Sequence, residues 1–133
     1  MQAALDAGLP VVFFPEGTTS NGSHLLKFHS GLLSQVIAGG APVGAAYLSY
    51  SFVADNGPDV TVVDDICYWG DRNMWTHIFR FLALRGVRAQ VRFAEEPIAF
   101  SSDGLHRKMA AVEARSAVAA LGAGQVTERM HHF

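Results

Sequence analysis

One short segment of the chain combines a carboxylate with three hydroxyl groups directly after an apolar run. It begins at Pro15, and its polar members are Glu16, Thr18, Thr19 and Ser20. The carboxylate of Glu16 can accept hydrogen bonds from substrate hydroxyls, and the hydroxyls and backbone N–H groups that follow can bind an anion. Pro15 restricts the backbone, and Gly17 permits a tight turn or the close approach of a ligand. The segment is therefore a candidate binding and catalytic site.

The elements around this segment alternate between strand and helix patterns. Such alternation is typical of an α/β fold, here a mostly parallel sheet flanked by helices. Val11–Phe14 is a continuous apolar run, which predicts a central strand covered on both faces. In open α/β sheets, ligands bind outside the carboxyl ends of the strands, where Glu16 would lie. Further strands are expected at 42–53, 60–63 and 87–93, and helices at 2–8, 31–38, 72–85 and from Ser102 or Asp103 to Leu121.

The composition excludes several classes of protein. The chain has 133 residues, half of them hydrophobic, and a net charge of −2, which is the composition of a globular domain and not of a general nucleic-acid binder. Its one cysteine, Cys67, excludes a disulfide framework and a thiolate zinc cluster, and no metal site is predicted. We expect one domain over residues 1–121 and a frayed tail over 122–133.

Charges and aromatic residues are distributed unevenly in the second half. The acidic cluster comprises Asp55, Asp59, Asp64, Asp65 and Asp71, and the basic cluster that follows comprises Arg72, Arg80, Arg85, Arg88 and Arg92. We expect the two clusters to pair in part; alternatively, the basic face binds anionic lipid headgroups or an anionic substrate. The helix expected in this region carries apolar residues at helical spacing, and we expect them to pack into a core. They are Trp75, Phe79, Phe81 and Leu82. Alternatively, they line a tunnel for an acyl chain or contact a membrane.

The order of motifs resembles a known enzyme family. Phe14-Pro15-Glu16-Gly17-Thr18 is similar to the third conserved block of the 1-acyl-sn-glycerol-3-phosphate acyltransferases, the PlsC-type glycerolipid acyltransferases. Phe28-His29-Ser30-Gly31 is similar to the Phe-Lys-x-Gly element that follows in that family, and the apolar run from Ala41 to Ala46 to its fourth block. The resemblance covers roughly residues 2–120.

This resemblance implies acyl transfer from acyl-CoA or acyl-carrier protein, as co-substrate, to the hydroxyl of a lyso-lipid, with no further cofactor. Glu16 and Gly17 would be the catalytic residues of this chain. Substrate contacts would come from Pro15, Thr18, Thr19, Ser20 and His29. The family also implies a membrane surface as partner and a location at the cytoplasmic face, either peripheral or anchored through a preceding segment.

Three departures from the family change what we expect. None of the six histidines has an Asp five positions later, so the family's general-base pair in a His-x-x-x-x-Asp block is missing, and the chain is interpreted as an N-terminally incomplete acyltransferase that is inactive alone. Thr19 stands where many members carry Arg, which binds phosphate well. His29 replaces the commoner Lys, which weakens a basic contact.

The acceptor expected first is 1-acylglycerol-3-phosphate, as in phospholipid biosynthesis. Because Thr19 carries no charge, lyso-ornithine lipid is an alternative acceptor. A non-catalytic module that binds a lipid or an anion is a further alternative, because the general-base pair is missing.

Overall fold

The structure is a computed structural model that describes residues 2–101 and 106–130. The chain divides into two compact units. The first unit contains the described residues of Met1–Gly17, Lys27–Tyr47 and Phe93–Phe133, and the second contains Thr18–Leu26 and Leu48–Arg92. The candidate segment is divided between them, because the boundary falls after Gly17.

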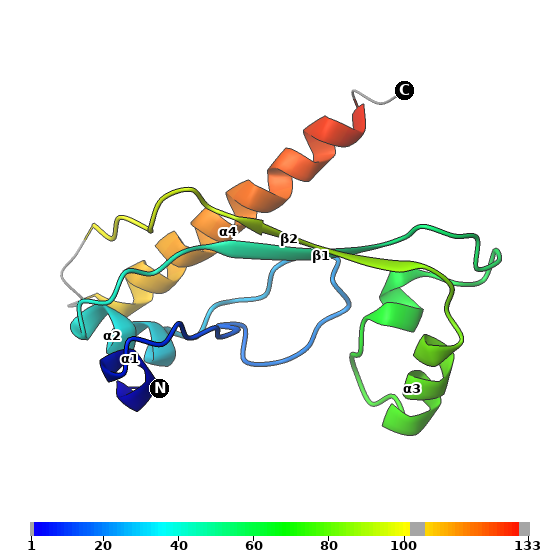
Figure 1. Ribbon diagram of the computed structural model, residues 1–133, viewed down its shortest axis with the longest axis horizontal. Coiled ribbons are helices and arrows are strands. Elements are labelled where there is room, and N and C mark those ends of the chain that lie inside the picture. The colour runs from blue at the N-terminus through cyan, green and yellow to red at the C-terminus, as the bar shows by residue number, and fades with distance from the viewer. Residues whose placement is uncertain (1, 102–105, 131–133) are drawn as a thin grey trace. The chain divides into compact units, whose positions relative to one another are not determined.

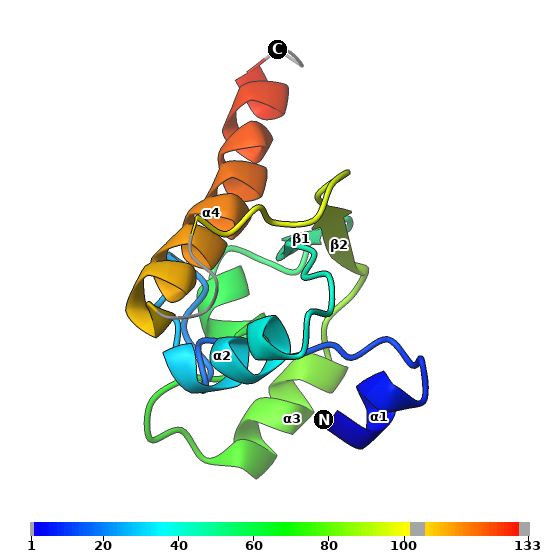
Figure 2. The same cartoon turned by 90° about the vertical axis from the view of Figure 1, so that its left-hand side faces the viewer.

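The first unit contains three helices, which Figure 1 shows as α1 (Gln2–Asp6), α2 (Ser30–Ala38) and α4 (Arg107–Met130). Helix α2 packs against α4, as the turned view in Figure 2 also shows. The buried side chains of this core are Phe28, Leu33, Ala111 and Ala114. The alanines of α4 leave room for the larger side chains, and complete burial of a residue such as Leu33 stabilises the fold by about 1.5–3 kcal/mol.

Two strands, β1 (Ala46–Phe52) and β2 (Val87–Phe93), pair as a two-stranded sheet. Backbone hydrogen bonds continue past both ends of the ladder. The Val53 N–H donates to the Gly86 oxygen at 2.7 Å, and the Ala94 N–H donates to the Ala45 oxygen at 2.9 Å. One strand therefore rises in number as the other falls, which makes the pair antiparallel.

The second unit is built around η1 (Val62–Ile66), one turn of π-helix, and α3 (Met74–Leu82). Asn73 caps α3, since its side-chain oxygen accepts from the backbone N–H of Trp75 at 3.0 Å and of Thr76 at 3.2 Å. This satisfies two donors that the first turn of a helix leaves free.

Local patterns predicted several elements correctly. The helices expected at 31–38 and 72–85 are α2 and α3, and the strand expected at 87–93 is β2. Strand β1 lies inside the expected range 42–53. Gly8 ends the first helix with φ of +71°, a conformation that glycine adopts without a steric penalty.

Other expectations were wrong. Val11–Phe14 forms neither strand nor helix, and only alternate side chains are covered: Val12 is 85% and Phe14 70% exposed, while Phe13 packs on the core. The strand expected at 60–63 is replaced by η1. The described strands form an antiparallel pair, so mixed helix and strand content is established while the mostly parallel sheet remains a prediction.

The end of helix α4 also differs from expectation. Helix α4 continues to Met130, well past Leu121, so the helix crosses Gly122 and Gly124 despite the low helix propensity of glycine. Its expected caps, Ser102 and Asp103, lie outside the described residues. The division into residues 1–121 and a tail over 122–133 remains a prediction.

In the described part of the chain, no helix combines the length and apolar character needed to cross a bilayer.

Candidate functional site

The first half of the candidate segment folds into a tight turn. The Gly17 N–H donates to the Phe14 oxygen at 3.2 Å, and Gly17 has φ of +67°. A second bond ties this turn to the start of α2, because the His29 N–H donates to the Pro15 oxygen at 2.7 Å. Two elements that lie apart in the sequence, Pro15–Gly17 and His29, are therefore held together within the first unit.

The imidazole of His29 lies against the backbone of Gly17. A Cβ atom built on Gly17 would be 2.9 Å from Cδ2 and 3.3 Å from Nε2 of that ring. Any side chain at position 17 would displace the ring, so glycine is required both by space and by its positive φ. His29 stands at the N-cap of α2 without a side-chain capping bond. Its ring is therefore placed for packing on the turn and not for capping the helix.

The seven candidate residues differ in exposure and in unit. Glu16 and Pro15 are half-buried, whereas Gly17 and His29 are exposed, and these four lie in the first unit. Thr18, Thr19 and Ser20 belong to the second unit, where the first two are exposed and Ser20 is half-buried. The structure thus brings together Pro15, Glu16, Gly17 and His29.

The polar loop after Thr19 is organised by its own hydrogen bonds. Ser20 Oγ accepts from the Gly22 N–H at 3.2 Å, and Asn21 Oδ1 accepts from the Ser23 N–H at 3.0 Å. Ser23 Oγ lies 2.9 Å from Nδ1 of His24. The hydroxyl of Ser20 therefore already accepts one hydrogen bond, which leaves its O–H donor and its second lone pair for a ligand.

An apolar hollow of about 470 Å³ lies in the first unit beside the segment that leads to the turn. It is lined by Leu5, residues 8–11, Phe13, Val36 and residues 41–44. The lining offers hydrocarbon contacts and includes Phe13, two residues before Pro15. Such a surface suits an aliphatic chain better than a charged group.

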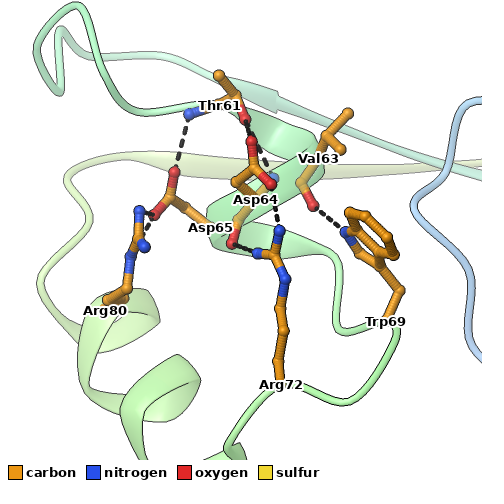
Figure 3. Close-up of polar contacts among 7 residues, drawn as sticks. All are labelled: Thr61, Val63, Asp64, Asp65, Trp69, Arg72 and Arg80. Atoms are coloured by element: carbon orange, nitrogen blue, oxygen red, sulfur yellow. Dashed lines mark hydrogen bonds and ion pairs between the residues drawn. The ribbon is translucent and has the colours of Figure 1, made fainter.

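A polar network in the second unit was predicted only in outline. The expected pairing of acids and arginines is confirmed for two pairs, Asp64 with Arg72 and Asp65 with Arg80. Figure 3 shows both arginines pointing at these carboxylates, with Thr61 in contact with both acids. The Thr61 N–H donates to Asp65 Oδ2 at 2.9 Å, and the Thr61 hydroxyl donates to Asp64 Oδ2 at 3.0 Å.

The two carboxylates sit in different environments. Asp65 is only 2% exposed and accepts from Nε of Arg80 at 2.8 Å, so its charge is neutralised inside the fold. Hydrogen bonds from Arg72 and Thr61 lower the pKa of Asp64. The sequence carried a usable sign of this turn, because Thr61 and Asp64 have the spacing of a capping box, with Asp in place of Glu.

The arginine of the first pair also braces an aromatic ring. The guanidinium of Arg72 lies 4.7 Å from the ring centre of Trp69, whose Nε1–H donates to the Val63 oxygen at 2.9 Å. These contacts give Arg72 and Trp69 structural roles.

Among the described residues, no three His, Cys, Asp or Glu side chains are grouped so that they could hold a metal ion. Burial raises the pKa of the free Cys67 thiol.

Comparisons with known proteins place this geometry in context. A family model described as Acyltransferase matches residues 1–49, which include all seven candidate residues. The chain is similar to the lyso-ornithine lipid O-acyltransferase of Pseudomonas aeruginosa (strain PAO1), with 36% identity over 115 residues. That alignment covers 86% of this chain and 41% of the relative, so the chain spans less than half of the relative's length. No solved structure matches the chain.

Proposed function

We infer that the enzyme that contains this chain transfers a fatty acyl group to the hydroxyl of lyso-ornithine lipid; the chain itself belongs to the PlsC-type glycerolipid acyltransferase family. The donor is an acyl thioester, either acyl-CoA or acyl-carrier protein. The family and the 36% identical relative support acylation of a lyso-lipid in general. The acceptor, the donor and the membrane as a working surface are parts of the proposal.

The charges of the candidate segment support this acceptor. From Pro15 to Ser20 the chain offers one carboxylate and three hydroxyls, but no basic side chain. A phosphate-bearing acceptor would be served best by a guanidinium, which binds phosphate in a bidentate manner. Ornithine carries an ammonium group, which a carboxylate such as that of Glu16 binds favourably. The name of the 36% identical relative points the same way.

The reaction needs a base, an oriented hydroxyl and a positioned thioester. The hydroxyl oxygen attacks the thioester carbonyl carbon, its proton passes to the base, and collapse of the tetrahedral intermediate expels the thiolate, which is then protonated. In this scheme Glu16 orients the acceptor, and the turn at Gly17 holds Glu16 in place. None of the six histidines is followed five positions later by Asp. The printed 133 residues are therefore proposed to lack the base and to be inactive alone.

The donor and acceptor together determine the location that we propose. Acyl thioesters are made in the cytoplasm, and a lyso-lipid lies in a bilayer. The enzyme is therefore proposed to work at the cytoplasmic face of a membrane. The parallel glycerolipid acyltransferase fold is proposed on the same basis as the family.

The test measures transfer of labelled acyl groups by protein expressed from its native gene and natural start. Lyso-ornithine lipid and lysophosphatidate are offered separately. We expect product from lyso-ornithine lipid, and Glu16→Gln should lower kcat/KM about 10- to 100-fold, because a hydrogen bond to a charged group contributes about 1.5–3 kcal/mol. Glu96→Gln, at an exposed glutamate of the same unit, is the matched control and should leave kcat/KM unchanged.

The outcomes separate the alternatives. Transfer to lysophosphatidate alone would replace the acceptor and keep the reaction. Binding of either lipid without transfer would favour the non-catalytic module. Equal loss of activity in Glu16→Gln and Glu96→Gln would remove the role assigned to Glu16.

A further inference from the structure

Polar and aromatic contacts attach helix α3 to the rest of the second unit. Arg80 forms an ion pair with the buried Asp65, with Nη2 2.6 Å from Oδ1. The ring of His77 meets Tyr68 edge to face, with ring centres 5.3 Å apart. These contacts, together with the Asn73 cap, hold the helix in place through its polar side.

Another side of the same helix exposes a stripe of large apolar residues. Trp75, Phe79 and Leu82 follow one another at spacings of four and three residues, which places them along one side of a helix. Their exposed fractions are 65%, 69% and 71%. The expectation that this helix packs its aromatic residues into a core was therefore wrong within the described residues, because Phe81 is exposed as well. We call Trp75, Phe79 and Leu82 the α3 stripe.

The charges of residues 72–94, the segment that contains α3, favour an anionic partner. No acidic residue occurs between Arg72 and Ala94, and Arg85 and Arg88 are exposed. Two acids that contact this region, Asp64 and Asp65, are each held by an arginine. The acids that remain exposed are Asp71, Asp59 and Asp55, the last of which shares a hollow with Arg85. Within residues 72–94, Arg88 is therefore the exposed arginine for which the structure shows no acidic neighbour.

We propose that α3 docks this protein on the surface of a membrane that contains anionic phospholipids. The α3 stripe enters the boundary between headgroups and acyl chains, and Arg88 lies at the level of the lipid phosphates. A helix with Trp, Phe and Leu on one side and polar residues on the other is the type that lies in this interface. Tryptophan is well suited to it, since its ring is largely apolar and its N–H can stay hydrated.

This docking surface extends the proposed function, because a lyso-lipid acceptor lies in a membrane, but its test requires no acyl transfer. Flotation with vesicles measures binding and separates bound protein from aggregates. The vesicles are phosphatidylcholine alone, or phosphatidylcholine mixed with phosphatidylglycerol. We expect flotation with the anionic vesicles, weakened by salt. Trp75→Ser combined with Phe79→Ser should lower the partition coefficient at least about tenfold, because both side chains leave the apolar layer.

A matched control comes from α4. Met109 and Val112 are 52% and 64% exposed, so replacing both by serine removes apolar surface of similar exposure in the other unit, and binding should not change. Arg88→Gln should reduce binding to anionic vesicles and leave binding to phosphatidylcholine as it was. Far-ultraviolet circular dichroism of each variant checks that the helices remain formed.

Tryptophan fluorescence gives an independent readout of the same contact. Anionic vesicles should shift the emission to shorter wavelength in the wild type. Trp75→Phe should still float but lose this shift, since Trp69 is already packed against Arg72. Absence of flotation in the wild type would overturn the proposal, as would equal losses in the α3 and α4 variants. Failure of acyl transfer with intact flotation would instead count against the proposed function alone.

Discussion

Replacing Gly17 by alanine tests whether the turn before α2 is held by contact with His29. Two costs add in this variant. Alanine at φ of +67° loses about 1–2 kcal/mol, the penalty for an L-residue in the left-handed region. The new Cβ would also lie 2.9 Å from Cδ2 of His29. Pushing the ring away from its preferred rotamer adds on the order of 0.5–1.5 kcal/mol.

Gly40 separates these two costs. Its φ is +68°, within a degree of that of Gly17, and nothing lies within 4 Å of the Cβ position. Gly40→Ala should therefore show the backbone penalty alone. The excess loss in Gly17→Ala, on the order of 0.5–1.5 kcal/mol, measures the contact with His29.

The contact itself is tested by a double-mutant cycle with His29→Ala. Since His29 is exposed and makes no side-chain capping bond, its replacement alone should change the unfolding free energy by less than about 0.5 kcal/mol. In the His29→Ala background, Gly17→Ala should cost no more than Gly40→Ala. Urea titration followed by circular dichroism measures all four variants and the wild type. The reasoning is refuted if Gly17→Ala costs as much with His29 absent as with His29 present.

Two further predictions concern the polar network of the second unit. Arg80→Ala leaves the buried carboxylate of Asp65 without its cation, so the free energy of unfolding measured by urea titration should fall by about 3 kcal/mol. This value lies toward the lower limit for breaking a buried pair, because the Arg80 side chain is itself partly exposed. A loss no greater than that in Arg72→Ala, at the more exposed pair, would contradict this reasoning. The lowered pKa of Asp64 means that its ion pair stabilises the fold above the unfolded pKa, near 3.8, and that this stabilisation is lost as pH falls through the lower folded value. Melting temperatures between pH 5 and pH 2 (roughly the window of carboxylate titration) should therefore fall less steeply in Asp64→Asn than in the wild type.

The sequence predicted the elements whose stabilising contacts are local. The spacing of apolar residues in α3 and the alternation in β2 are both read within a few residues. The helix stop at Gly8 is equally local. The paired acids and arginines were also predictable in kind, since Asp64 and Arg72 are eight residues apart in two adjacent clusters of opposite sign.

Elements that depend on distant partners were predicted less well. An apolar run such as Val11–Phe14 is a strand only if another strand lies beside it to accept its backbone hydrogen bonds. In the described part of the chain, the side chains of this run alternate between half-buried and exposed, but the run forms no strand. The strand expected at residues 60–63 was wrong for the opposite reason, because a local contact overrides the strand pattern. A local capping bond, in which the Asp64 N–H donates to the Thr61 hydroxyl oxygen, competes with the strand and produces a helical turn.

The candidate site shows why residue types alone could not assign His29. The comparison of His29 with the lysine common in the family drew attention to its charge, and predicted a weakened basic contact. That contact stays a prediction. The structure shows a steric role as well, because the flat ring covers the Cα of Gly17 while the backbone N–H of His29 donates to the Pro15 oxygen. A glycine at 17 and a ring at 29 depend on each other, since any Cβ at 17 would occupy the space of the ring. The shape of the turn that carries Glu16 thus depends on a residue twelve positions later, and no pattern confined to the segment itself could have revealed it.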